Sequence, residues 1–366
     1  MVTKFVTSAG IPVVGYRLPV DAVQFHETMR ALWLLFGAVV GACLGSFANV
    51  VVARLPAGES VAHPPSRCPS CKTPIAPWDN IPVVSWLVLR GRARCCGVPI
   101  SPRYALVEAL GLGLGWAVVA MDGPGVHAVL HGLMLLCLVC IALIDLDTFE
   151  VPPVLSVGLA VLAFGQQGWA VWENTHALRP AAEAFASGPL LGAVLGWGLM
   201  ALLRVSSTFV ARRTGRIGAD EEAQGRGDED MMWGIGAMLG PGALFWALAM
   251  GCSQGVAVAY GLRALHRRDG RTGAWRGMGP AGQAAAAAAA AGEPTTAEPP
   301  GDAVTSGATP GAEPGGSEDG WIPPENSIQL GPFLALGAVE ALFAMPWLPP
   351  LDLVTAVQVL LGIGQQ

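Results

Sequence analysis

Charged side chains are scarce in this chain of 366 residues. Lys, Arg, Asp and Glu together make up 13% of the sequence, whereas a typical soluble domain has about 25%. Tyrosine is also rare, with 3 residues, while hydrophobic residues account for 52%. This composition excludes an ordinary soluble globular domain and predicts an all-α, polytopic integral membrane protein. The lipid bilayer is therefore an expected partner, and no nucleic-acid partner is expected.

The N-terminal residues have little of the pattern of a signal peptide, and we expect no cleavable one. Residues 1–30 are mixed in polarity and include Pro12, Pro19 and several charged side chains, unlike the basic start and apolar centre of a signal peptide. We expect 1–30 to be an N-terminal extracytoplasmic segment. The first apolar stretch, 31–53, would then serve as an uncleaved anchor.

The chain contains many long apolar stretches. A helix needs about 20 such residues to cross a bilayer. The candidates are 31–53, 104–121, 125–144, 152–170, 188–204, 231–250, 251–264 and 327–346. They predict about eight transmembrane helices, and a further stretch at 351–363 is expected to be a half-span or an interfacial helix.

Basic residues are concentrated in alternate loops, which sets the expected orientation. Lys and Arg gather in 54–103, in the loop after the fifth span and in the stretch after the seventh, whereas 122–124 has none. Because cytoplasmic loops carry the excess of Lys and Arg, we expect these three segments to be cytoplasmic. The N-terminus would then lie on the opposite side.

The expected domains follow from these segments. A cytoplasmic cysteine-containing domain is expected at 54–103, a membrane-embedded core at 104–264 and a C-terminal transmembrane segment at 327–366. Residues 265–326 are rich in Ala, Pro and Gly. Such a composition cannot bury a core, so a disordered cytoplasmic linker is expected there.

Two aspartates lie where apolar stretches meet short loops. Asp145 follows an apolar run and precedes Pro152, and Asp228 closes the segment 225–228, whose sequence is GRGD. Carboxylates at the edge of the hydrocarbon are costly, which makes them candidates for function. The predicted topology brings both to the cytoplasmic side. There, two carboxylates that share one proton would form the machinery of an aspartyl protease.

The neighbours of these aspartates suit that chemistry. Gly225 and Gly227 let the backbone approach closely and adopt turns that other residues resist. Pro152 ends the helix that precedes it and shapes the loop. All three are therefore predicted to shape the site.

Several alternatives stay open on spacing alone. Asp147 could replace Asp145 in the pair, and Asp230 could replace Asp228. Each aspartate taken singly could also be an ordinary loop carboxylate at a wet interface. A transporter or channel is a further alternative, although it predicts carboxylates near the middle of a span.

Four cysteines lie in the predicted cytoplasmic domain, namely Cys68, Cys71, Cys95 and Cys96. A CxxC pair followed by a second pair is the layout of a tetrahedral zinc site, and the cytoplasm keeps thiols reduced. We therefore expect these four residues to hold Zn²⁺. Adjacent cysteines suit a tetrahedral site less well than CxxC, so a degenerate site without metal remains the alternative.

Several segments together carry a family resemblance. They are GSFANVVVARLP (45–56), SRCPSC (66–71), NIPVVSWL (80–87), LRGR (89–92), PISPRYALVE (99–108) and GPFLALGA (331–338). Through them the chain resembles the type IV prepilin leader peptidases. These are bacterial inner-membrane aspartyl proteases of the GxGD type.

The resemblance implies that Asp145 and Asp228 are the catalytic aspartates. It implies that prepilins or pseudopilins are cleaved at the cytoplasmic face of the bacterial inner (cytoplasmic) membrane, and that proteolysis needs no cofactor. Many members also methylate the new N-terminus with S-adenosylmethionine. Because the family's leaders are basic, our hypothesis is that acidic residues such as Glu222, Glu229 or Asp230 recognise them.

The chain departs from the family pattern at three positions. Pro153 replaces an acidic or amide residue, Asp230 replaces a lysine, and Ala93 replaces a cysteine for which Cys95 could stand in. The added negative charge of Asp230 near the pair motivates an alternative function. In that alternative, the protein is a catalytically silent membrane scaffold for pilus or type II secretion assembly.

Overall fold

The structure is a computed structural model. It describes residues 2–6, 12–16, 20–68, 70–173, 186–215, 218, 225–269 and 330–344. The expected helix at 351–363 and most of the expected linker at 265–326 lie outside these residues.

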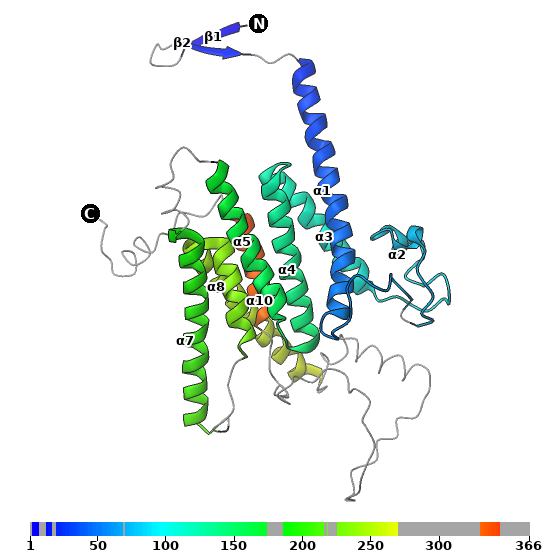
Figure 1. Cartoon of the computed structure of the whole chain (residues 1–366), viewed down its shortest axis with the longest axis vertical. Helices are drawn as coiled ribbons and strands as arrows, with labels where there is room; N and C mark the ends of the chain where they lie inside the picture. Colours follow the sequence, from blue (N-terminus) through cyan, green and yellow to red (C-terminus); the bar gives the residue numbers. More distant parts are fainter. Residues whose placement is uncertain are drawn as a thin grey trace, which may run out of the picture.

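Helices dominate the described residues, as the sequence predicts (Figure 1). The long helices are α1 (Val20–Arg54), α3 (Pro102–Asp122), α4 (Val126–Thr148), α5 (Pro153–Glu173), α7 (Leu191–Arg213), α8 (Gly227–Asp269) and α10 (Gly331–Ala344). Shorter elements are a 3-10 turn at Pro77–Asn80, α2 (Val84–Val88) and a π-helical turn at Ala186–Leu190. One antiparallel hairpin, β1 (Val2–Val6) with β2 (Pro12–Tyr16), precedes α1 and was not expected. Because α1 begins at Val20, it also takes in part of the expected N-terminal segment.

The expected polytopic, predominantly helical membrane architecture is confirmed in the described residues. Among the described residues, six helices are long and apolar enough to cross a membrane, and the shorter apolar helix α10 adds to them. The spans expected separately at 231–250 and 251–264 both lie in the single element α8. Because α8 is broken at Gly240, the two expected spans correspond approximately to its two halves, with the boundary at Gly240 and not after residue 250.

A sharp bend at Gly240 folds α8 back on itself. Gly240 has φ 69° and ψ 177°, values that favour glycine, and Pro241 follows it. The first residue of α8, Gly227, lies against Val151 beside the end of α4, whereas Gly240 lies near Gly188 at the start of α7. Gly251 then packs on the start of α10, so both halves of α8 reach the end of the bundle where α4 stops.

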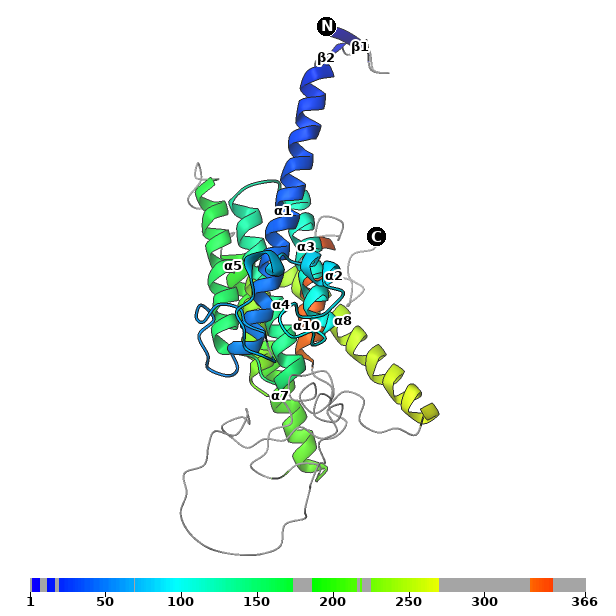
Figure 2. The ribbon, with the colours of Figure 1, turned by 90° about the vertical axis from the view of Figure 1, so that its right-hand side faces the viewer.

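The outermost part of α8, yellow in Figure 2, points away from the bundle. Its backbone therefore leaves the packed helices at the same end as the α4–α5 loop. This is the end to which the site described below belongs.

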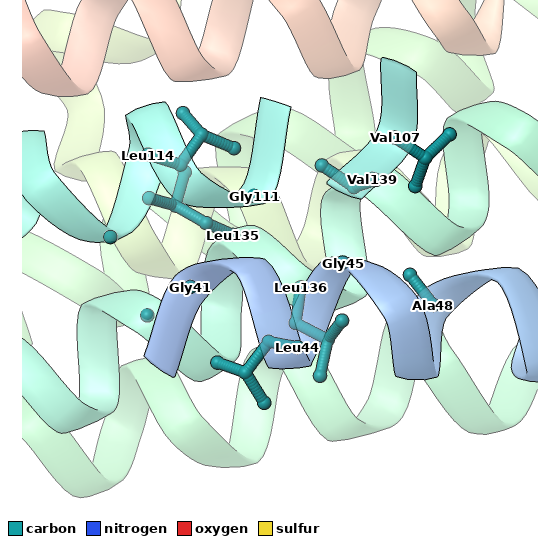
Figure 3. A pocket seen from close by; sticks show the side chains of 12 residues that line it. Gly41, Leu44, Gly45, Ala48, Val107, Gly111, Leu114, Leu135, Leu136 and Val139 are labelled. Carbon is teal, nitrogen blue, oxygen red and sulfur yellow. The ribbon is translucent and has the colours of Figure 1, made fainter. Parts of the chain in front are cut away.

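Glycines allow neighbouring helices to approach closely. A Cβ atom at Gly45 of α1 would lie 2.7 Å from the carbonyl oxygen of Val107 in α3, and Gly41 and Gly111 likewise face the backbone of the partner helix. Small residues at such interfaces are typical of membrane helices. Figure 3 shows the apolar pocket that these glycines, together with Leu135 and Leu136 of α4, leave between α1, α3 and α4.

Two hydrophobic cores meet on α4. The larger core joins α4, α5, α7, α8 and α10 through residues such as Leu138, Leu159 and Met232. The smaller core joins α1, α3 and α4 through residues such as Ala48 and Cys140. Large apolar side chains remain exposed on the outer faces of the helices, as expected where a bilayer surrounds a bundle.

The segment between α1 and α3 is anchored to α3 by polar contacts. The Val83 N–H donates to the Glu108 carboxylate at 2.6 Å, and the Trp86 indole N–H donates to the carbonyl of Ile100 at 3.1 Å. This segment contains the four cysteines, so they are held beside the bundle rather than on a free loop.

Candidate active site

Asp145 lies in the last turn of α4 and is 5% exposed. The helix ends at Thr148, whose hydroxyl donates to the carbonyl of Ile144 at 2.9 Å. Phe149 then adopts a left-handed conformation, and its N–H donates to the carbonyl of Asp145 at 2.8 Å. The backbone of Asp145 is thus part of the helix C-cap, which fixes the carboxylate relative to the bundle.

Asp228 lies in the first turn of α8 and is half-buried. It is close enough to Asp145 for the two carboxylates to interact electrostatically. Gly227 makes this approach possible, because a Cβ atom there would lie 2.8 Å from the Cβ atom of Val151. The structure therefore brings together the two aspartates that the sequence analysis selected.

Gly331, the first residue of α10, completes this cluster. Its backbone N–H donates to the Asp145 carboxylate, and a Cβ atom at this position would overlap that carboxylate. The N–H groups of the first helical turn have no partner within the helix and favour negative charge. Sequence reasoning did not assign Gly331 to the site, although the Gly-Pro pair that opens the last apolar run was a usable signal.

The alternative aspartates have other surroundings. Both carboxylate oxygens of Asp147 accept hydrogen bonds from the Arg103 guanidinium, at 2.7 and 2.8 Å. Asp230 is exposed. The carboxylates of Asp145 and Asp228 interact with each other. This interaction favours the Asp145–Asp228 pair over pairs that contain Asp147 or Asp230.

The other residues predicted to shape the site differ in their surroundings. The carbonyl of Pro152 accepts from the Leu155 N–H at 3.0 Å and so begins α5. Gly225 is exposed, and no described residue lies within 4 Å of a Cβ atom placed there. Close approach thus depends on Gly227 and not on Gly225. Glu222 lies outside the described residues. Glu229 is buried and paired with Arg204, which does not suit the leader recognition expected of it.

The four predicted metal-binding cysteines converge in space. The sulfur atoms of Cys68, Cys71, Cys95 and Cys96 all lie within 4.8 Å of one another. The shortest separations are 3.3 Å between Cys71 and Cys95 and 3.6 Å between Cys68 and Cys96. Four thiols at such distances form a donor set suited to a tetrahedral Zn²⁺.

Two similar turns bring these cysteines together. In the first turn, the Cys68 N–H donates to the carbonyl of Thr73 at 2.9 Å and the Ile75 N–H donates to that of Ser66 at 2.9 Å. In the second turn, 25 residues later in each case, Ala93 bonds in the same way to Val98, and Ile100 bonds to Gly91. Ala93 therefore occupies the position that corresponds to Cys68.

The cysteine pairs also differ in acidity. Hydrogen bonding with Thr73 lowers the pKa of Cys71 to about 6. Hydrogen bonding with Cys71 raises the pKa of Cys95 to about 12. The cluster therefore holds a thiolate at neutral pH, and this thiolate is the form that binds a metal.

Known protein families match most of the described helices. A model of the bacterial peptidase A24 N-terminal domain matches residues 39–122, and a model of the type IV leader peptidase family matches residues 132–260. A prepilin leader peptidase/N-methyltransferase of Myxococcus xanthus is 33% identical over 351 residues, which cover 87% of this chain and 92% of that protein. The chain belongs to the type IV leader peptidase family.

Two further relatives carry the same description. A protein of Klebsiella pneumoniae is 39% identical over 230 residues, covering 60% of this chain and 91% of its own length. A protein of Neisseria gonorrhoeae is 32% identical over 232 residues, covering 57% of this chain and 74% of its own length. No solved structure matches the chain.

The structure explains how the chain accommodates Pro153 and Ala93, two of its departures from the family pattern. Pro153 is the first residue of α5, where proline is favoured because its missing N–H would have no partner within the helix. At the position of Ala93, the nearby Cys95 brings a sulfur atom into the cluster. Both substitutions are thus accommodated by the fold.

Proposed function

We propose that this chain is a membrane aspartyl endopeptidase that cleaves the leader peptides of prepilins or pseudopilins. The observation that carries the proposal is the buried Asp145, which interacts with Asp228 and accepts a hydrogen bond from Gly331. The family membership and the names of the relatives support the same substrate class. Methylation of the new N-terminus from S-adenosylmethionine is part of the proposal, because the relatives are named as N-methyltransferases.

The aspartate pair supplies the chemistry for peptide hydrolysis. With one proton on the pair, the ionised carboxylate takes a proton from water while the oxygen attacks the scissile carbonyl carbon. The protonated carboxyl donates a hydrogen bond to the carbonyl oxygen as charge develops there. The tetrahedral intermediate then collapses, the C–N bond breaks, and the leaving nitrogen receives a proton from the pair.

The proposed location is the bacterial inner membrane, with the site at the cytoplasmic face. The cysteine segment, the end of α7 at Arg212 and Arg213, and the outer part of α8 all lie toward the end of the bundle that holds Asp145. Because basic segments favour the cytoplasmic side, this arrangement supports cleavage at that face.

The proposed metal is Zn²⁺, held by Cys68, Cys71, Cys95 and Cys96. A metal bound by both turns would link residues on either side of α2 and stabilise the segment between α1 and α3. It would have no part in the hydrolytic step. Measuring zinc content in the purified protein and in a Cys68→Ser/Cys71→Ser variant tests this directly, and equal content in both would refute the site.

The experiment that tests the proteolytic function is leader cleavage by the full chain in detergent or lipid. We expect the wild type to cleave a prepilin and the Asp145→Asn and Asp228→Asn variants to lose at least about 10²-fold in rate. The Glu27→Gln variant, which changes an exposed carboxylate in the first turns of α1, serves as the control and is expected to cleave normally.

The alternative function predicts a different result. A silent membrane scaffold for pilus or type II secretion assembly would not cleave any pilin across a pH series, even when well folded. The exposed Asp230 beside the pair motivates this alternative. An Asp230→Lys variant that gained cleavage would identify that residue as the cause.

A further inference from the structure

Four carboxylates gather where α4 ends and α8 begins. Asp145 and Asp147 lie in the last turn of α4, and Asp228 and Glu229 lie in the first turn of α8. Asp145 is 5% exposed, and the side chains of Asp147 and Glu229 are 6% and 7% exposed. Buried carboxylates that share a helical turn repel one another unless positive charge compensates them.

Arg103, in the first turn of α3, compensates Asp147. Its two terminal nitrogens donate to the two oxygens of Asp147 at 2.7 and 2.8 Å, and one of them also donates to the carbonyl of Leu143 at 3.3 Å. Leu143 and Asp147 lie two residues before and two residues after Asp145. One guanidinium therefore holds the helical turn that carries Asp145.

Arg204 of α7 compensates Glu229. Its Nε atom donates to a carboxylate oxygen of Glu229, and the two side chains are 18% and 7% exposed. Glu229 directly follows Asp228. A second arginine, from a different helix, thus holds the turn that carries the second aspartate.

We propose that Arg103 and Arg204 are positioning residues for the aspartate pair, one for each aspartate. Each neutralises the carboxylate beside its aspartate and fixes the turn on which that aspartate lies. The proton that moves during the reaction then belongs to Asp145 and Asp228 and is not shared with Asp147 or Glu229. This inference rests on the proposed function, because only proteolysis requires the pair to hold its own proton.

Other charged groups around these turns contribute less. They are the exposed Glu150, Arg226 and Asp230, with Arg54 of α1, Glu108 of α3 and Glu340 of α10. The last three each form a hydrogen bond with a group outside the cluster. Glu173 of α5 is far from the cluster, because it bonds His127 in the first turn of α4, at the opposite end of that helix from Asp145. Exposed charges are screened by water and salt, so the buried Asp147 and Glu229 are the neighbours whose charge matters most to the pair.

The sign of the expected effect follows from this arrangement. Without Arg103, the negative charge of Asp147 disfavours the ionised form of the pair, and a more alkaline solution is needed to create the general base. The pH–rate profile therefore shifts to higher pH. Removing the charge of Asp147 as well takes away the cause of the shift.

The test compares single and double variants of the full chain in detergent. We expect Arg103→Gln to lower kcat about tenfold and to shift the pH–rate profile by about one pH unit to the alkaline side, with KM little changed. In Arg103→Gln/Asp147→Asn the profile returns to that of the wild type. Arg204→Gln and Arg204→Gln/Glu229→Gln should behave in parallel, and Arg103→Lys should recover only part of the rate, because lysine lacks the two-pronged contact.

A matched control separates the effect from a general loss of positive charge. Arg213 lies on the same helix as Arg204, with its guanidinium carbon 4.6 Å from the centre of the Phe209 ring, so Arg213→Gln should leave rate and profile unchanged. A single variant with reduced rate but an unshifted profile would overturn the proposal, since a purely structural role predicts that result. The proposal would also be overturned if the pH–rate profile of the double variant were shifted as far as that of the single variant.

A second readout does not depend on cleavage. The infrared band of the protonated carboxyl, assigned by its loss in Asp145→Asn, can be titrated in each folded variant. We expect the titration to move to higher pH in Arg103→Gln and to return in the double variant. A protein that fails to cleave but shows this movement would refute the proposed function and leave the positioning role intact, whereas an unmoved band would refute the positioning role alone.

Discussion

At the residue scale, the two glycines that precede Asp228 have different roles. Gly227 packs against Val151, whereas Gly225 is exposed with no described atom within 4 Å of its position for a side chain. The approach of α8 to the end of α4 therefore depends on the absence of a Cβ atom at residue 227. The same logic applies to Gly331, where the missing side chain makes room for the Asp145 carboxylate.

This difference predicts unequal effects of alanine. Gly227→Ala should lower kcat/KM for leader cleavage by about 10²-fold, because a displacement of about 1 Å at a catalytic pair has an effect of that order. Gly225→Ala should leave kcat/KM within about twofold of the wild type, since it meets no packed neighbour. Steady-state kinetics on both variants checks this, and equal losses would contradict the role assigned to Gly227.

The cysteine cluster allows a prediction on pH at the same scale. Because the pKa of Cys71 is lowered to about 6 and that of Cys95 is raised to about 12, alkylation of the metal-free protein at neutral pH should select Cys71. Its rate should rise as the pH passes through about 6, where the reactive thiolate forms, and should level off above it. Mass spectrometry after iodoacetamide treatment measures both sites.

Thr73→Val provides the control for this measurement. The variant removes the hydroxyl that bonds Cys71 and should move the rise in alkylation rate toward the pH of an ordinary thiol. Added Zn²⁺ should protect all four cysteines. Alkylation of Cys95 before Cys71 would contradict the assignment of the thiolate.

At the scale of elements, the two cysteine turns are structural copies in which one cysteine is displaced. Ala93 corresponds to Cys68 by its hydrogen bonds, and Cys95 supplies the fourth sulfur from two residues further on. A cysteine at position 93 is therefore expected to take over from Cys95.

A swap of the two positions tests this relation. Cys95→Ser should lower the zinc content or the affinity for zinc by at least tenfold, since it removes one of four ligands. Ala93→Cys/Cys95→Ser should restore it, and cobalt substitution should give the visible absorption of a tetrahedral thiolate site in both the wild type and the double variant. Failure of the double variant to recover would show that the second turn cannot present a ligand at residue 93.

The sequence contained enough information for the helices, but not for the contacts between distant elements. Apolar length predicts α3, α4 and α5 closely, because membrane helices need long apolar runs whatever their packing. The two spans predicted within α8 divide at Gly240 and not after residue 250, because uniform hydropathy across the stretch does not show where the chain reverses. Arg103 and Gly331 were missed as members of the site because their partners lie far away in the sequence.

At the scale of the whole molecule, α4 is the element that both cores share. It packs against α1 and α3 on one side and against α5 and α10 on the other. The family matches divide the chain at nearly the same place, between residues 122 and 132. The helix that carries Asp145 is therefore also the helix that joins the two halves.

The turn of α8 at Gly240 has a consequence for how the chain can vary in length. Because α8 returns to the end of the bundle where α10 begins, residues 269 and 330 leave and re-enter the described structure toward the same end. The intervening chain does not have to cross the membrane, so its length is not tied to the bilayer thickness.

Shortening the segment 270–329 by half should accordingly leave leader cleavage and thermal stability close to those of the wild type, measured with the same detergent-purified protein. Inserting a fluorescent protein into this segment should likewise leave cleavage and thermal stability close to those of the wild type. In contrast, Gly240→Leu places a side chain at a positive φ, where it is strained, and should lower thermal stability. The turn at Gly240 thereby leaves one part of the polypeptide free to acquire new sequence during evolution without altering the packed helices.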